Sequence, residues 1–194
     1  MTRGRGVVLS CVDRGSQRVD FGRVLETVAG FFEGTGFRYA VIGAFGLHAY
    51  GLSRGTFDLD FVVEAAAQPQ LVAFFESLGY ETLHVSAGYS NHLHALTALG
   101  GVDVVYVTGE TSERLFEACR AMPGPGGLPV PVPRPEHLAA MKIQAMKNDP
   151  RRTLGEMEDI RFILTLPGVD EVEIRGYFER AGLRDRYDEL KRLG

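Results

Sequence analysis

The chain has 194 residues, of which 45% are hydrophobic and 24% charged, a composition typical of one globular domain or of a core with a small appendage. Its formal net charge of −4 excludes a globally basic protein of the kind that binds nucleic acid through its overall charge, although a local basic patch remains compatible with it. No apolar run approaches the roughly 20 residues that a membrane-spanning helix needs.

The predicted elements of the first half alternate between helices and strands. Residues 1–18 are predicted to be an N-terminal extension, because their apolar stretch is too short for a secretory signal. Apolar spacing and glycine stops then predict five elements. These are a helix at 19–33, a strand at 39–42, a short helix at 44–50, a strand at 57–64 and a helix at 68–78.

The second half begins with further strands and ends in helices. Strands are predicted at 80–85, 91–96 and 102–107, with a hairpin turn at 99–101 and a helix at 112–122. The proline- and glycine-rich stretch 123–135, with one short strand at 128–132, is the best domain boundary. Helices follow at 136–146, 154–166, 170–180 and 184–193.

This order predicts an α+β fold with an α/β-like core. We assign the core to residues 19–133 and a helical C-terminal region to residues 134–194. The two cysteines, Cys11 and Cys119, fit no metal-binding spacing. We interpret them as reduced thiols of a cytoplasmic protein without a membrane partner, with a single disulfide as the alternative.

Two carboxylates on one strand are the centre of the functional prediction. Asp58 and Asp60 alternate with the apolar residues Leu59, Phe61 and Val63, so both point to the same face of the strand. Like charges placed together do not stabilise a fold. Carboxylate oxygens held rigidly suit magnesium, which also takes substrate phosphates as ligands.

A third carboxylate, Asp103, lies in another apolar strand. If that strand neighbours the first, Asp58, Asp60 and Asp103 form a triad able to hold two divalent metal ions. Asp103 is then also the candidate general base for a hydroxyl nucleophile. The alternative is that each aspartate is merely solvated at a strand end, because Asp-x-Asp alone is a weak motif.

The segment before the acidic strand favours a phosphate ligand. A glycine turn at Gly43 and Ala44 stands between a strand and a helix, where free backbone N–H groups bind anions. The alternative is a tight connection without a ligand. Arg54 precedes the acidic strand and suits a phosphate, or else it forms an ion pair with Asp58 or Asp60.

Together, residues 43–60 resemble the signature of the DNA polymerase β-like nucleotidyltransferase superfamily. More narrowly, they resemble the minimal nucleotidyltransferases related to the AbiEii and MenA toxins of bacterial toxin–antitoxin systems. Arg54, Thr56, Asp58 and Asp60 match that signature in order and spacing, and Asp103 matches the third carboxylate. The resemblance implies a mixed twisted sheet flanked by helices.

The resemblance extends into the helical region, over residues 37–166. Lys142 matches a lysine that would contact the triphosphate, and Asp159 matches an acidic residue of a later motif. The chain departs from the pattern at Ala44, where the family has glycine or serine, and at Glu156, where it often has aspartate. These departures concern the binding of the donor nucleotide more than the binding of metal.

The resemblance implies an enzyme that moves a nucleotidyl group from a nucleoside triphosphate, such as ATP, to a hydroxyl acceptor and releases pyrophosphate. Two Mg²⁺ ions, or Mn²⁺, would be its cofactors, and tRNA, a protein or a small molecule its acceptor. As a toxin it would have a cognate antitoxin as partner. Two alternatives stay open: a catalytically idle nucleotide- or partner-binding module, and a metal-dependent phosphohydrolase.

Other polar residues suit more than one role. His92 and His94 share a strand face and are taken as exposed hairpin residues, with metal or phosphate binding as the alternative. His48 is interpreted as a packing residue. Lys147, Arg151 and Arg152 form a basic cluster that suits either an RNA acceptor or a solvated helix end.

Overall fold

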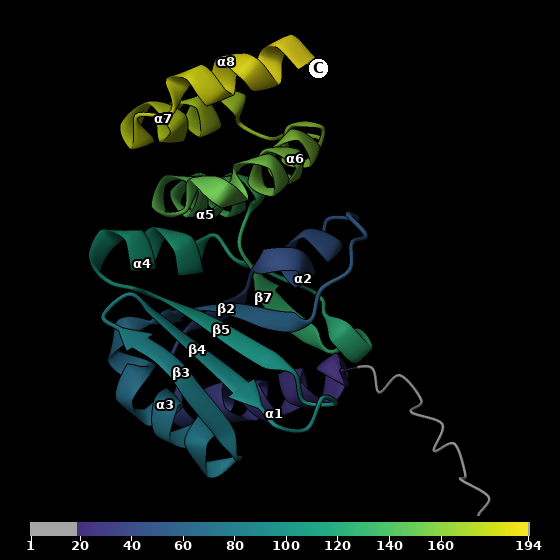
Figure 1. Cartoon of the computed structure of the whole chain (residues 1–194), viewed down its shortest axis with the longest axis vertical. Helices are drawn as coiled ribbons and strands as arrows, with labels where there is room; N and C mark the ends of the chain where they lie inside the picture. The colour runs from purple at the N-terminus through teal and green to yellow at the C-terminus, as the bar shows by residue number, and fades with distance from the viewer. Residues whose placement is uncertain (1–18, 194) are drawn as a thin grey trace, which may run out of the picture.

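The structure is a computed structural model that describes residues 19–193. The predicted extension 1–18 and Cys11 lie outside this range. The first half of the described chain forms a layered core around a five-stranded sheet (Figure 1). The core elements are α1 (Phe21–Thr35), β1 (Tyr39–Val41), α2 (Gly43–His48), β2 (Asp58–Glu64), α3 (Gln68–Ser77), β3 (Tyr80–Ser86), β4 (Tyr89–His94), β5 (Gly101–Val107) and α4 (Gly109–Glu117).

The strands follow the order β1-β2-β5-β4-β3, and only the central pair β2–β5 is parallel. Helices α1 and α3 cover one face of this mixed sheet, and α2, α4 and the C-terminal helices lie on the other side (Figure 1). Leu59, Phe61 and Val63 of β2 are fully buried under α1 and α3, as their alternation predicts. The even-numbered residues of β2 therefore face the second side of the sheet.

The second half of the described chain contains a small hairpin, four α-helices and a short 3-10 helix between the first two of them. Its elements are β6 (Arg120–Pro123), β7 (Pro129–Val132), α5 (Pro135–Asn148), the 3-10 helix η3 (Pro150–Arg152), α6 (Thr153–Leu164), α7 (Glu171–Ala181) and α8 (Arg184–Leu193). The prediction of one helix over 112–122 is wrong at its end. Helix α4 ends at Glu117, because Arg120–Pro123 pairs with β7 as a two-stranded sheet.

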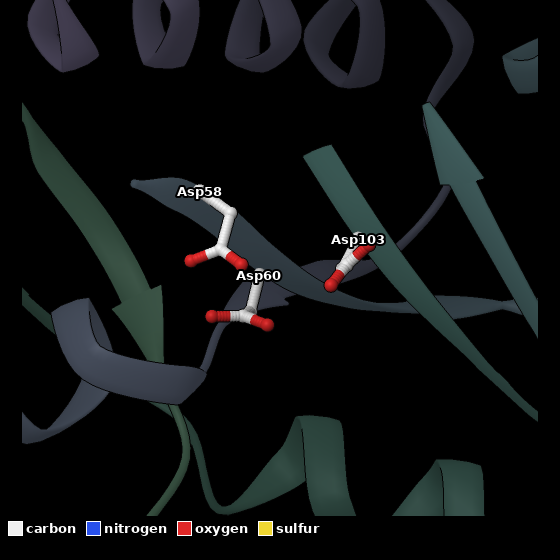
Figure 2. A group of neighbouring side chains, drawn as sticks. All are labelled: Asp58, Asp60 and Asp103. Atoms are coloured by element: carbon white, nitrogen blue, oxygen red, sulfur yellow. The ribbon is translucent and has the colours of Figure 1, made fainter. Parts of the chain in front are cut away.

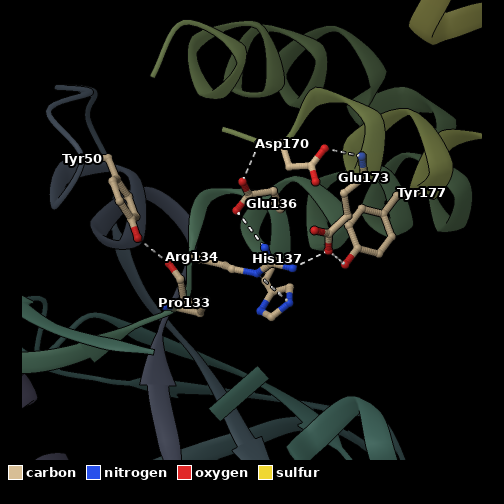
Figure 3. A network of polar contacts seen from close by, with 8 residues as sticks. All are labelled: Tyr50, Pro133, Arg134, Glu136, His137, Asp170, Glu173 and Tyr177. Atoms are coloured by element: carbon tan, nitrogen blue, oxygen red, sulfur yellow. Dashed lines mark hydrogen bonds and ion pairs between the residues drawn. The ribbon is translucent and has the colours of Figure 1, made fainter. Parts of the chain in front are cut away.

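A group of polar contacts surrounds the start of α5 (Figure 3). Arg134 pairs with Glu173 of α7 at 2.5 Å, and Glu136 accepts a hydrogen bond from the backbone N–H of Asp170 at 2.7 Å. Tyr50, just after α2, donates to the carbonyl of Pro133 at 2.8 Å. In the described part of the chain, no helix is long and apolar enough to cross a membrane.

Candidate active site

The parallel pairing of β2 with β5 brings three carboxylates together. Asp60 is the direct register partner of Asp103, and Asp58 lies two residues before it on the same face of β2. One oxygen atom from each side chain lies within 4.8 Å of the other two (Figure 2). The prediction that the strand of Asp103 neighbours that of Asp58 and Asp60 is confirmed.

The chemistry of this group suits a divalent cation. All three side chains offer carboxylate oxygens, the ligands that magnesium prefers. Burial, followed by the charges of Asp58 and Asp103, raises the pKa of Asp60 from 3.8 to about 7. A cation bound among the three carboxylates would relieve both penalties, so the residues present fit a metal site.

Hydrogen bonds orient two of the three carboxylates. Thr56 donates to Oδ1 of Asp58 at 2.6 Å. Tyr89 donates to Oδ1 of Asp103 at 2.9 Å, and the side-chain amide of Asn91 donates to the same oxygen. Both donors lie on β4, which pairs with β5 on the side away from β2. The other oxygen of Asp103 therefore stays available for a ligand.

Tyr89 and Asn91 were not among the candidate site residues predicted from the sequence. In the sequence, these two residues could be found only from the alternation that places Tyr89, Asn91 and Leu93 on one face of β4. That alternation points to the site only when β4 is known to lie beside β5. Burial, together with the charge of Asp103 and the hydrogen bond to it, raises the pKa of Tyr89. The phenol therefore remains a proton donor to the carboxylate at neutral pH.

The glycine turn is fitted against the acidic strand. Gly43 has φ +58°, and a Cβ atom at this position would lie 1.9 Å from Oδ2 of Asp60. The backbone N–H of Ile42 donates to the carbonyl of Asp60 at 2.9 Å, which fixes the turn to β2. Ala44, the other residue of the predicted turn, is buried and is not among the residues that line the cleft beside the three carboxylates.

A basic wall faces the carboxylates from the helical region. Lys142 of α5 is almost fully buried, and its Nζ lies 2.9 Å from Glu156 and 2.7 Å from Asp159, both on α6. Arg152 pairs with Glu156 at 2.5 Å. These ion pairs hold two cations in place beside the carboxylate group.

Arg54 joins this charged network from the loop before β2. Its guanidinium lies 3.3 Å from Asp159, so the alternative pairing with Asp58 or Asp60 is wrong. His48, interpreted from the sequence as a packing residue, packs its ring against Phe45 at 5.1 Å. It also holds the same loop, because its Nε2 lies 2.8 Å from the carbonyl oxygen of Arg54. Asp159 thus holds both Arg54 and Lys142 in position through ion pairs.

A cleft of about 540 Å³ separates the two walls. The sheet supplies one wall with the three aspartates, Tyr89 and Val105. Helix α5 and the turn after it supply the other, with Lys142, Asn148 and Arg152 among its residues. Gly43, Arg54 and Thr56 line the cleft as well, so most of the predicted ligand-binding residues meet there.

His92 lies on the opposite face of the sheet from this cleft. Its side chain is fully buried and stacks on Phe75, with Ser90 at 2.9 Å from Nε2 and Thr82 at 3.1 Å from Nδ1. Burial lowers its pKa. The prediction that His92 is exposed is wrong, because α3 covers this face of β4.

The fold matches those of known nucleotidyltransferases. No protein-family model matches the sequence, and no curated protein is significantly similar to it. Among solved structures, ANT(2'')-Ia in complex with adenylyl-2''-tobramycin gives a TM-score of 0.61 at 17% identity, over 86% of this chain and 99% of that chain.

Two further structures support the same comparison. Lincomycin-bound LnuA, a lincosamide antibiotic adenylyltransferase, gives 0.51 at 15% identity, over 76% of this chain and 98% of that chain. An antigenic nucleotidyltransferase-like protein from Paracoccidioides brasiliensis gives 0.52 at 16% identity, over 89% and 92% of the two chains. The chain therefore has a nucleotidyltransferase fold, as its resemblance to the polymerase β-like superfamily implies.

Proposed function

We propose that the protein is a metal-dependent nucleotidyltransferase that moves a nucleotidyl group from a nucleoside triphosphate to a hydroxyl acceptor. The observation that supports this proposal is the pairing of two unlike walls across one cleft. Asp58, Asp60 and Asp103 form the acidic wall, and Arg54 and Lys142 stand opposite. In such an arrangement the basic wall neutralises the charge of a triphosphate, and the acidic wall binds metal at the phosphate to be transferred.

The basic wall is suited to the leaving pyrophosphate. Arg54, Lys142 and Arg152 line the cleft, and the first two are already ion-paired to Asp159. Their positions are therefore fixed before the donor binds, which lowers the cost of organising the site. The turn at Gly43 and Ala44 would offer backbone N–H groups to the same phosphates.

The acidic wall is suited to the attacking hydroxyl. Asp103 would accept the proton of the acceptor hydroxyl through the oxygen that Tyr89 and Asn91 leave free. The acceptor oxygen then bonds to the α-phosphorus as the bond to pyrophosphate breaks. Mg²⁺ held by Asp58, Asp60 and Asp103 would supply Lewis-acid stabilisation of the phosphate charge.

The identity of the acceptor is a separate part of the proposal. Proteins with a similar fold include ANT(2'')-Ia and LnuA, whose structures contain an adenylylated antibiotic and an antibiotic, and this supports a small-molecule acceptor over tRNA or protein. A role as a toxin with a cognate antitoxin rests on the sequence resemblance alone. Residence in the cytoplasm rests on the interpretation of the two cysteines as reduced thiols. The use of ATP as the donor remains a prediction.

The test is transfer of label from each α-labelled nucleoside triphosphate, with Mg²⁺ present, into tobramycin, lincomycin, tRNA and cell protein. We expect labelled product and released pyrophosphate with the parent chain and neither with the Asp58→Asn, Asp60→Asn variant. Glu26→Gln, at an exposed site on α1 on the far side of the sheet, is the matched control. Equal transfer by the parent chain and the double variant would contradict the proposal.

A nucleotide-binding module without turnover is the second candidate. It is favoured by the ion pairs that already occupy Lys142, whose partners Glu156 and Asp159 are both buried. Isothermal titration with ATP and Mg²⁺ separates the two candidates. Nucleotide binding that Asp58→Asn weakens, without pyrophosphate release in any acceptor mixture, would favour the idle module.

A further inference from the structure

Helix α5 carries an uncharged strip of residues beside Lys142. The strip consists of four residues spaced i, i+3, i+4 and i+7, which places them on one face of the helix: Met141, Gln144, Ala145 and Asn148. All four line the cleft of about 540 Å³, as Lys142 does. Because none of the four side chains is charged, the strip suits an uncharged part of a ligand rather than a phosphate.

The two polar residues of this strip are joined to each other. Nε2 of Gln144 donates to Oδ1 of Asn148 at 2.8 Å. Within residues 19–193 neither carboxamide makes a second hydrogen bond, and both side chains are exposed. The bond leaves the oxygen of Gln144 as an acceptor and the nitrogen of Asn148 as a donor. The pair therefore presents a donor and an acceptor side by side to a ligand in the cleft.

An apolar part of the sheet lines the same cleft. Val105 follows Asp103 by two residues on β5, so it lies on the same face of the sheet, about 6.5–7 Å further along the strand. Its register partner on β4 is Tyr89, which also lines the cleft. Val105 and Met141 pack against the same buried cluster. The cleft thus has apolar side chains on both walls, with Val105 on the sheet and Met141 and Ala145 on α5.

A nucleobase has the chemistry that these two features match. Its ring is flat and can pack against other side chains through its faces, while its edge carries hydrogen-bond donors and acceptors next to one another. The carboxamides of asparagine and glutamine match such an edge with two hydrogen bonds. A phosphate would instead be bound best by charged donors, which the strip lacks.

The strip is also within reach of a donor whose phosphates are held by Lys142. Asn148 lies six residues beyond Lys142, which corresponds to about 9 Å along the helix axis. In a nucleoside triphosphate the ribose separates the base from the phosphates, so the two parts can contact different residues of one helix. The free oxygen of Asp103, on the opposite wall, is left to the acceptor hydroxyl.

We propose that Gln144 and Asn148 bind the edge of the donor's nucleobase, with the ring held between Val105 and the apolar residues of the strip. This inference rests on the proposed function, because it places the base of the same donor whose phosphates face Lys142. It gives α5 two tasks in donor binding. Lys142 contacts the phosphates, and the uncharged strip contacts the base.

The test compares two probes by isothermal titration of the full chain with Mg²⁺ present. The first is the tightest-binding of the non-hydrolysable ATP, GTP, CTP and UTP analogues, and the second is ribose 5-triphosphate, which has no base. Gln144→Ala and Asn148→Ala should each weaken binding of the nucleotide analogue about threefold to tenfold, as expected for one lost hydrogen bond. Binding of ribose 5-triphosphate should not change. Gln70→Ala, at an exposed site on α3 under the opposite face of the sheet, is the matched control.

Ala145→Leu tests the position of the ring independently of the hydrogen bonds. The larger side chain would take up space that the proposal gives to the base, and leucine is a good helix former. We expect weaker binding of the nucleotide analogue and unchanged binding of ribose 5-triphosphate. Circular dichroism should show the same folded state as in the parent chain.

The outcomes separate this inference from the proposed function. Equal affinity of the parent chain for the two probes, or equal losses for both probes in the variants, would overturn the base contact and leave nucleotidyl transfer standing. A raised KM for the acceptor alone in Gln144→Ala or Asn148→Ala would place the acceptor on the strip and overturn the inference too. If the parent chain bound neither probe and transferred label to no acceptor, the proposed function itself would be wrong.

Discussion

Asp60 shows how the fold and the candidate chemistry oppose one another at a single residue. Its side chain lies between the turn at Gly43 and the carboxylates of Asp58 and Asp103, an arrangement that disfavours a negative charge. A divalent cation reverses this preference. The residue is therefore a source of instability without metal and a candidate ligand with it.

The stability of the metal-free protein should fall as the pH rises from 3.8, the ordinary pKa of an aspartate, to about 7, the pKa of Asp60 in the folded protein. Folded Asp60 keeps its proton up to about pH 7, whereas the unfolded chain loses it near 3.8. The folded state therefore binds more protons in this interval, and the free energy of unfolding decreases with pH. Thermal melts in EDTA should show Asp60→Asn more stable than the parent at about pH 8 and similar to it at about pH 4. Parallel pH profiles for the two chains would contradict this assignment.

Tyr89 is a positioning residue in this proposal, because it acts through Asp103. Tyr89→Phe removes one of the two donors to Oδ1 and should lower kcat about tenfold to a hundredfold, with little change in the KM for the nucleotide. Tyr39→Phe, on the edge strand β1, is the matched control. An unchanged kcat, or a loss of folded protein by circular dichroism, would contradict a positioning role.

At the scale of the element, the sequence predicted the strands and helices that carry their own periodicity. The burial of Leu59, Phe61 and Val63, and therefore the face taken by Asp58 and Asp60, follows from alternation alone. Strand β6 could not be predicted this way, because its conformation comes from pairing with β7 rather than from its own residues. The prediction that His92 is exposed was wrong because its burial also depends on another element. Phe75, which covers His92, belongs to α3.

The turn between β1 and α2 should tolerate no side chain at Gly43. Gly43→Ala would combine a positive φ with a Cβ atom inside the carboxylate of Asp60, and backbone strain of this kind costs about 1–3 kcal/mol before the clash is counted. We expect a lower Tm and loss of Mg²⁺-dependent nucleotide binding. Gly55→Ala, where a Cβ meets nothing within 4 Å, should change neither. Equal Tm values for the two variants would rule out this close approach.

At the scale of the whole molecule, one charged network joins the sheet to the helical region. Arg54 comes from the loop before β2, Lys142 from α5, and Asp159 from α6. No local pattern could predict the contact between Arg54 and Asp159, because it depends on how the helices pack on the core. The division into a core at 19–133 and a helical region at 134–194 remains a prediction.

Lys142 should therefore serve stability as well as substrate binding. Lys142→Met removes the cation that the buried carboxylates of Glu156 and Asp159 share. Each carboxylate keeps one partly exposed arginine, so we expect a loss below the roughly 3–5 kcal/mol typical of a buried charge left without a partner, at about 1–3 kcal/mol. Urea unfolding measures this loss. Lys147→Met, on the exposed side of the same helix, should cost less than about 0.5 kcal/mol. Similar unfolding free energies for the two variants would show that the network contributes little.

The contact between the turn and the acidic strand also limits which substitutions the family can accept during evolution. Because the carboxylate of Asp60 occupies the space that a Cβ atom at position 43 would need, the two positions cannot change independently. A lineage that keeps aspartate at 60 must keep glycine at 43. One that replaces Asp60 with a smaller residue loses the clash but keeps the positive φ at position 43, which still favours glycine. Among relatives that have lost the acidic triad, residue 43 should diversify only where the turn has also lost its positive φ.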